Sequence, residues 1–310
     1  MAERPGAPPG ERLRDRLAAA GYTAGWAWLS RLPDALVARA FDAGADLAVR
    51  RDGAGVRRLR ANLARLRPDV PPAELDDLVR RGMRSYARYW REAFTLPALD
   101  PAAVHAAMAP HVHGIEESLA SVQAGRGVLY ALPHAGNWDV AGVYLVRELA
   151  RRGLDPAMTT VVQRLRPESL FRRFAAYRRT LGFEIVPADD ARAAHRALTA
   201  RLRSGGVVCL VADRDLSGTG PEVEFLGGPA RLPSGPVRLA ALTGAALHPV
   251  CPFFTGDAWG VEVAPEIAVG TEPSRAGVAE AVQELADAFG VLLARRPQDW
   301  HMLQPIGGTR

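Results

Sequence analysis

The hydrophobic and polar positions divide the chain into two parts with different periods. Over residues 11–96 the apolar residues recur at the three- and four-residue steps of a helix, with breaks at Pro33, 52–55 and 68–72. From about Gly125 short apolar runs alternate with amphipathic stretches, which predicts strands that alternate with helices. The expected strands are 127–132, 157–162, 183–187, 207–212, 222–226, 247–254 and 259–264. The expected helices are 138–152, 168–181, 191–203, 235–243 and 276–295.

This alternation predicts an α/β fold, in which a central, mostly parallel β-sheet is flanked by helices and preceded by an N-terminal helical segment. A chain of 310 residues is long enough to form one such domain. We expect residues 1–10, which are rich in Pro and Gly, to be disordered, and residues 11–310 to form a single domain. Within it, 11–124 is the helical part and 125–310 the α/β part.

Two aromatic stretches stand out in the helical part. In the predicted helix 74–94, aromatic residues recur on one face, which either faces the core or lines an apolar groove; they are Tyr86, Tyr89, Trp90 and Phe94. Tyr22, Trp26 and Trp28 begin an amphipathic stretch with arginines nearby, a pattern typical of a membrane interface. The alternative is that these three side chains pack on the domain.

The charge balance indicates anionic partners. The formal net charge is +5, and the chain contains no lysine, so all 39 Lys+Arg residues are arginine. Nucleic acid, phospholipid head groups and a phosphorylated cofactor are the partner classes that such a basic chain suits. The use of arginine alone either reflects genome composition or serves phosphate binding, because the arginine guanidinium binds phosphate bidentately. Cys209 and Cys251 lie in apolar runs and are expected to be reduced core residues.

No membrane-spanning segment or leader is predicted. No run approaches the roughly 20 apolar residues that a spanning helix needs. No apolar core of a signal peptide follows the first ten residues. We therefore expect a cytoplasmic protein that touches a membrane surface peripherally.

His134 and Asp139 are the candidate catalytic pair. They follow the strand 127–132 in the sequence Pro-His-Ala-Gly-Asn-Trp-Asp, and Asn137 is a plausible N-cap for a helix that starts near Trp138. A change of backbone state between them would let the two side chains converge, so that the histidine is a base and the carboxylate its orienting partner. The alternative is an acidic residue in the first turn of a helix beside a surface histidine.

Two further segments are candidates for the site. Asp213, Arg214 and Asp215 follow the strand 207–212, at the carboxyl end where open α/β sheets bind their ligands, unless they form only a strand-end salt bridge. The turn 230–236, which contains Arg231, opens a helix and offers N–H groups to an anion, unless it is an ordinary loop. His248 is more consistent with a structural role.

The sequence also disfavours several enzyme classes. It has no Gly-x-Ser-x-Gly elbow of a serine hydrolase, and a Walker loop requires lysine. No Gly-x-Gly-x-x-Gly follows a strand, and no spacing typical of metal ligands is present. We expect neither a metal nor a cofactor.

Taken in order, these motifs resemble the bacterial glycerolipid and lipid A acyltransferase superfamily. The resemblance is carried by His134 with Asp139 and by the segments 211–215, 231–236 and 247–252. A closer similarity to the actinobacterial phosphatidylinositol mannoside acyltransferases covers about residues 12–304. It is carried by 62–63, 86–90, 132–134, 210–216 and 298–304.

The resemblance implies acyl transfer from acyl-CoA, as co-substrate, to a sugar hydroxyl of a membrane glycolipid. It makes His134 the general base, oriented by Asp139, and implies that Arg164, Asp213 and Arg214 line the site. The other substrate-binding candidates are Arg178, Arg231 and Gln163, and at Gln163 many relatives carry Glu. The helical part would then face the cytoplasmic side of the cell membrane, and the α/β part would be catalytic.

The chemistry agrees with these residue types. A sugar hydroxyl is a poor nucleophile, and a neutral histidine that removes its proton typically accelerates attack by roughly 10²–10⁴-fold. We therefore predict a peripheral acyltransferase that acts on phosphatidylinositol mannoside or a similar glycolipid and binds no nucleic acid. One alternative is a lipid A-type acyltransferase, and the other is a basic, non-catalytic lipid- or nucleic-acid-binding protein.

Overall fold

The computed structural model describes residues 32–95, 99–163, 168–215 and 217–306, and its centre is a seven-stranded sheet. The strand order is β1-β9-β8-β2-β5-β3-β4. Five adjacent strands, from β8 to β4, run parallel, whereas β9 is antiparallel to β8 and parallel to β1. The bounds are β1 Val112–His113, β2 Val128–Leu132, β3 Met158–Val162, β4 Phe183–Pro187, β5 Val207–Val211, β8 Ala246–Thr255 and β9 Ala258–Val263.

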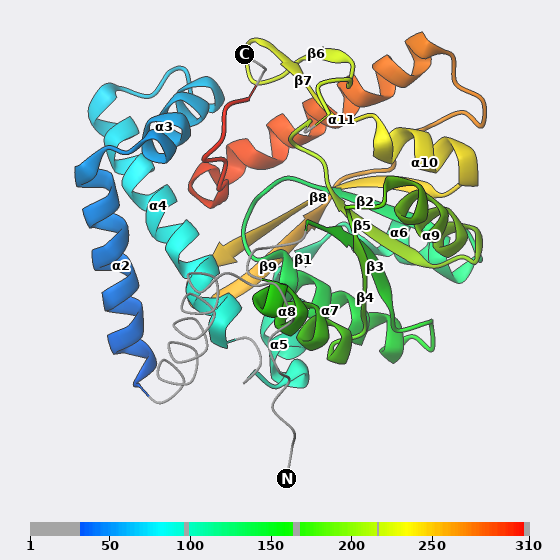
Figure 1. Ribbon diagram of the computed structural model, residues 1–310, viewed down its shortest axis with the longest axis horizontal. Helices are drawn as coiled ribbons and strands as arrows, with labels where there is room; N and C mark the ends of the chain where they lie inside the picture. Colours follow the sequence, from blue (N-terminus) through cyan, green and yellow to red (C-terminus); the bar gives the residue numbers. More distant parts are fainter. Residues whose placement is uncertain (1–31, 96–98, 164–167, 216, 307–310) are drawn as a thin grey trace.

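Helices cover both faces of the sheet (Figure 1). One face carries α5 (Pro101–Met108), α6 (Ile115–Gln123), α7 (Trp138–Arg151) and α8 (Glu168–Thr180), and the other carries α9 (Ala191–Arg203), α10 (Gly235–Thr243) and α11 (Arg275–Arg295). Strand β2 shows why: its side chains are buried on both faces, with Tyr130 and Leu132 in the core under α7 and Leu129 and Ala131 in the opposite core. A strand buried on both sides reads as a continuous apolar run, as 127–132 does.

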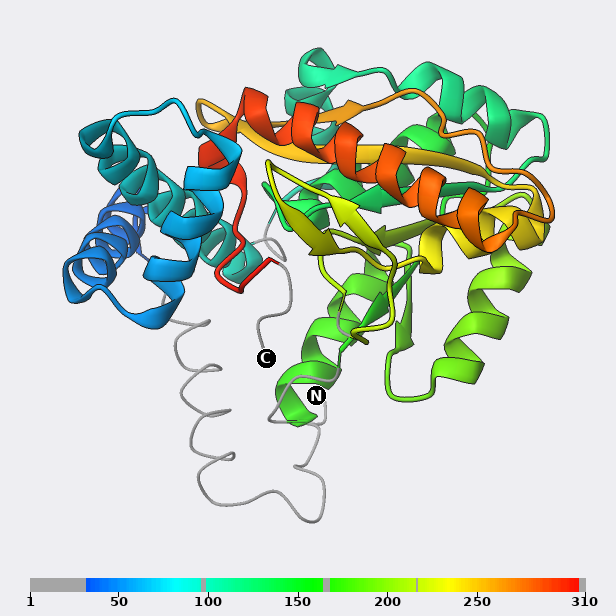
Figure 2. The same cartoon turned by 90° about the horizontal axis from the view of Figure 1, so that it is seen from above.

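The N-terminal helices form a separate layer beside the sheet (Figures 1 and 2). They are α2 (Asp34–Arg51), α3 (Ala54–Leu66) and α4 (Pro72–Thr95), and α4 packs on both others. Arg65 of α3 donates hydrogen bonds to the carbonyls of Phe225 and Gly228, at 2.6 and 2.8 Å. These bonds tie the helical layer to the antiparallel hairpin of β6 (Glu222–Glu224) and β7 (Pro229–Arg231).

The predicted fold class is confirmed, with three local differences. The strand expected at 222–226 pairs only with β7 in the small hairpin, outside the main sheet. β7 lies where a turn was expected, and the two-residue β1 lies within the segment expected to be helical. Two-residue and three-residue strands are too short to show an alternating pattern in the sequence.

Some expectations fall outside the described residues. They are the disorder of residues 1–10, the interfacial side chains Tyr22, Trp26 and Trp28, and the site residue Arg164. Across the residues that the structure describes, no helix combines the length and the apolar character needed to cross a bilayer.

Candidate active site

His134 lies in the loop that joins β2 to α7. Pro133 follows the strand, and Gly136 adopts a left-handed conformation with φ of 52°. A Cβ atom at Gly136 would lie 2.5 Å from the carbonyl carbon of Pro252, so only glycine lets this loop pass so close to β8. Asn137 caps α7 by accepting a hydrogen bond from the Val140 N–H, as predicted, and α7 begins at Trp138.

Asp213 orients the histidine. It follows β5, the neighbour of β2, so the carboxyl ends of two adjacent parallel strands bring together residues 79 positions apart. The Nδ1 atom of His134 is 2.6 Å from Asp213 Oδ1, and the backbone N–H of His134 donates to Asp213 Oδ2 at 2.8 Å. The Asp213 side chain is fully buried, whereas that of His134 is 47 % exposed. The imidazole is therefore held from the protein side and open on the other.

The two groups shift each other's pKa. Burial acts to lower the pKa of His134, but the charge and the hydrogen bond of Asp213 outweigh it, so that this pKa is raised. Burial acts to raise the pKa of Asp213, but the charge of His134 and the surrounding N–H donors lower it overall. Asp213 is thus an ionised carboxylate, which requires the proton on Nδ1 of His134. Nε2 then has the free lone pair of a base.

Asp139 has a different partner from the one expected. It lies in the first turn of α7 and accepts two hydrogen bonds from the Arg178 guanidinium, at 2.6 and 2.9 Å. Arg178 also lies over the ring of Trp138, 4.5 Å from its centroid. The structure thus places Asp213 at Nδ1 of His134 and uses Asp139 to fasten α8 to the start of α7. The catalytic roles of His134 and Asp139 stay predictions.

The other predicted site residues lie at several separate places in the structure. Arg214 is exposed at the end of β5, next to Asp213, and its charge acts on His134. Gln163 is exposed directly after β3. Arg231 is exposed in the hairpin, where it donates to the Gly220 carbonyl at 2.9 Å and pairs with Glu222. His248 is buried, and its Nδ1 is 3.0 Å from the carbonyl oxygen of Ala264, in agreement with a structural role.

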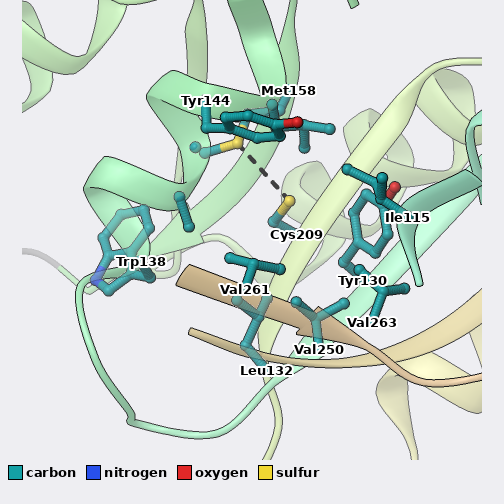
Figure 3. Close-up of a pocket in the computed structure, with 13 residues that line it drawn as sticks. Ile115, Tyr130, Leu132, Trp138, Tyr144, Met158, Cys209, Val250, Val261 and Val263 are labelled. Carbon is teal, nitrogen blue, oxygen red and sulfur yellow. Dashed lines mark hydrogen bonds between the residues drawn. The ribbon is translucent and has the colours of Figure 1, made fainter. Parts of the chain in front are cut away.

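An apolar cavity lies between α7 and the sheet (Figure 3). It holds about 450 Å³ of empty space, including the part open to solvent. Leu132 and Trp138, which flank the His134 loop, both line it, so the cavity extends from the neighbourhood of the catalytic candidate into the core. The other lining residues are Ile115, Tyr130, Ala141, Gly142, Tyr144, Leu145, Met158, Cys209, Val250, Val261 and Val263.

The aromatic face of α4 lies close to the same loop. The rings of Tyr86 and Tyr89 contact the ring of His301, with centroids 5.6 and 6.1 Å apart, and the His301 N–H donates to the carbonyl of His134. Burial lowers the pKa of His301 to about 3, and the charge of His134 acts in the same direction, so this second imidazole is neutral. The α4 face is half-buried.

Sequence reasoning missed two contributors. Trp300 donates to Asp213 from the C-terminal segment, and Glu92 of α4 accepts from the side chain of Asn137 at 2.8 Å. The segment 298–304 carried part of the family resemblance, which was the available signal for Trp300. No such signal exists in the sequence for Glu92, because a single acidic residue on an amphipathic helix is expected to lie on the solvent-exposed face.

Comparisons with known proteins identify the family of the chain. The family model described as "Bacterial lipid A biosynthesis acyltransferase" matches residues 13–306. A Mycolicibacterium smegmatis protein named phosphatidylinositol mannoside acyltransferase is 45 % identical over 287 residues, which cover 92 % of this chain and 90 % of that protein. A Mycobacterium tuberculosis protein of the same name is 44 % identical over 285 residues, 92 % of this chain and 86 % of that protein. The chain therefore belongs to the bacterial lipid A biosynthesis acyltransferase family.

Proposed function

We propose that this acyltransferase moves a fatty acyl chain from acyl-CoA to a sugar hydroxyl of a membrane glycolipid, a mannose of phosphatidylinositol mannoside. The observation that carries the proposal is the His134–Asp213 pair beside an apolar cavity. The names of the two mycobacterial relatives support the acceptor. The sequence also allowed a non-catalytic binding protein. Membership of an enzyme family supports the acyltransferase instead.

The acyl chain fits the cavity by chemistry and by position. The cavity is lined almost entirely by apolar side chains, the kind of lining that suits an acyl chain. A chain bound there would leave its thioester near Leu132 and Trp138, and therefore near His134. Arg214 is exposed and follows Asp213, and it is our candidate for binding a phosphate of the donor or of the acceptor head group.

The transfer needs no covalent enzyme intermediate. Nε2 of His134 takes the proton of the sugar hydroxyl as the hydroxyl oxygen attacks the thioester carbonyl carbon. The C–S bond then breaks, and the CoA sulfur leaves with the proton that His134 returns. Asp213 stabilises the imidazolium that exists between the two proton transfers.

Membrane association has support from α2. Leu36 and Leu47, 54 % and 43 % exposed, are eleven residues apart and so lie on one face of the helix. The exposed residues Arg39 and Arg50 lie along one edge of that face. An apolar stripe beside arginines suits an anionic bilayer surface, and we propose that the protein binds there peripherally, on the cytoplasmic side.

The decisive experiment measures acyl transfer from radiolabelled acyl-CoA to a panel of glycolipids. Phosphatidylinositol mannosides should accept the label, and lipid A precursors should not. The His134→Ala variant should lose at least about 10²-fold in rate, because general-base help is worth that much or more. His195→Ala is the matched control, since His195 is an exposed histidine on α9.

The outcomes separate the candidates. Transfer to lipid A precursors alone would replace the acceptor by the one that the family description prints. Near-wild-type turnover by a folded His134→Ala protein would overturn the mechanism.

A further inference from the structure

The C-terminal segment lies directly against the His134 loop. Ala135 and Trp300 form an isolated antiparallel bridge. The Gly136 N–H donates to the Asp299 carbonyl at 2.9 Å, and the His301 N–H donates to the His134 carbonyl at 2.7 Å. The backbone around the catalytic candidate is thus fixed by residues about 165 positions later in the chain.

The Trp300 side chain continues this contact into the acid–base pair. It is fully buried, and its indole N–H donates to Asp213 Oδ2 at 3.0 Å. Its ring meets Phe225 edge-on, with centroids 6.3 Å apart. Because an indole N–H is only a donor, Oδ2 has to be an acceptor, and it receives a second donor from the His134 backbone. This leaves Oδ1 for Nδ1 of His134.

The segment is itself held in place on its other side. The Asp299 carboxylate accepts hydrogen bonds from the Ser85 hydroxyl of α4 at 2.8 Å and from the Phe254 N–H of β8 at 2.9 Å. Trp300 therefore reaches Asp213 from a support that is fastened to two other elements. A group held so firmly can fix the orientation of the carboxylate that it contacts.

We propose that Trp300 is a positioning residue for acyl transfer: its indole N–H fixes the Asp213 carboxylate, and through it the imidazole of His134. The proposal rests on the proposed function. In this proposal the hydrogen bond from the indole N–H acts on catalysis, whereas the packing of the ring contributes only to stability. Without this donor the carboxylate carries more unshared negative charge, and only the backbone N–H of His134 still holds Oδ2.

The first test replaces Trp300 by Phe, which keeps a ring and removes the N–H. We expect kcat to fall about 10-fold, the lower end of the 10–100-fold range seen for outer partners at metal sites, with little change in either KM. The acidic limb of the pH–rate profile should move to higher pH, because a carboxylate with one donor fewer holds the imidazolium more strongly. The ionisable groups around His134 are Asp213, Arg214 and His301, and this variant leaves all three in place.

Phe225→Leu is the matched control. It disturbs packing against the same indole but leaves the N–H on Asp213. We expect this variant to lower the thermal midpoint while its pH limb stays at the wild-type position. The proposal would be overturned if Trp300→Phe also left the limb and kcat unchanged, or if both variants lost activity in proportion to their loss of thermal stability.

A second measurement starts from the wild-type protein and so does not depend on how the Trp300→Phe variant folds. In ¹⁵N-tryptophan-labelled protein, the Trp300 indole resonance should shift with pH at the midpoint of the acidic limb, and this shift should vanish in His134→Ala. Trp259 is an internal control, because its indole donates to another carboxylate, Glu92, at 2.8 Å. If no indole shifts with that midpoint while His134→Ala is inactive, the positioning role is wrong and the proposed function stands. An active His134→Ala enzyme would instead overturn the proposed function.

Discussion

Asp213 has the properties of the residue that decides the protonation state of His134. It is fully buried, and three N–H groups point at its two oxygens: Nδ1–H and the backbone N–H of His134, and the Trp300 indole. A buried carboxylate surrounded by donors stays ionised near neutral pH and holds its partner in one tautomer.

We therefore predict distinct effects for two carboxylate substitutions. Asp213→Asn puts an amide against Nδ1, which favours the tautomer with the proton on Nε2, so kcat should fall by about 10²–10⁴-fold. The raised pKa of His134 also depends on the Asp213 charge. Wild-type activity should be lost as the pH falls through the raised pKa of His134. The acidic limb of the Asp213→Asn profile should lie at lower pH. The measurement is the pH dependence of kcat/KM.

Asp139→Asn is the comparison for this prediction. It weakens the bidentate contact with Arg178, whose side chain is 12 % exposed, and should cost about 1–3 kcal/mol of stability. Its acidic limb should stay at the wild-type position. If the limb moved with Asp139→Asn and not with Asp213→Asn, Asp139 would be the orienting group after all.

At the scale of elements, α7 can approach the sheet closely because it has a glycine at position 142. A Cβ atom at Gly142 would lie 2.5 Å from Cζ of Phe183 and 2.7 Å from Cε of Met158. Gly142 and Met158 also line the apolar cavity. The close approach of α7 to β3 and β4 thus defines one wall of the proposed acyl site.

We predict that Gly142→Ala destabilises the protein although alanine favours helices. The added methyl group forces Met158 or Phe183 to move, at a cost of about 1–3 kcal/mol, whereas the gain in helix propensity is at most about 1 kcal/mol. Gly44→Ala in α2 is the control, because a Cβ there meets nothing within 4 Å. Thermal midpoints should fall for the first variant and rise for the second. A rise in both would show that this wall is loosely packed.

The elements themselves could largely be predicted from the sequence, whereas the site could be predicted only in part. Strands such as β2 and β5 are continuous apolar runs, and the cap at Asn137 is a local signal, so the pattern locates them. The contact between His134 and Asp213 depends on which strands are neighbours, and no periodicity within one segment reports that order. The prediction favoured Asp139 because it is near in sequence; its guanidinium partner, Arg178, comes from α8.

At the scale of the whole molecule, the exposed face of α2 gives the proposed membrane contact a test. Leu36→Gln with Leu47→Gln should weaken co-sedimentation with anionic vesicles, and added salt should weaken binding of the wild type because it screens the arginines. Turnover of a water-soluble acceptor analogue should be unchanged.

Leu242→Gln is the control for this experiment, since Leu242 is 47 % exposed but belongs to α10, away from the helical layer. Vesicle binding should be the same as for the wild type. Equal co-sedimentation of the α2 double variant would place the bilayer contact on another surface.

The bridge between residues 134–136 and 299–301 also sets an order of events during synthesis. A chain emerging from the ribosome forms its N-terminal helices and most of its sheet first. His134 and Asp213 are then both outside the ribosome, but the indole donor to Asp213 lies 87 positions further along the chain. The nascent protein can therefore support its acid–base pair fully only after Trp300 has been made, and a chain cut short before Trp300 lacks that support.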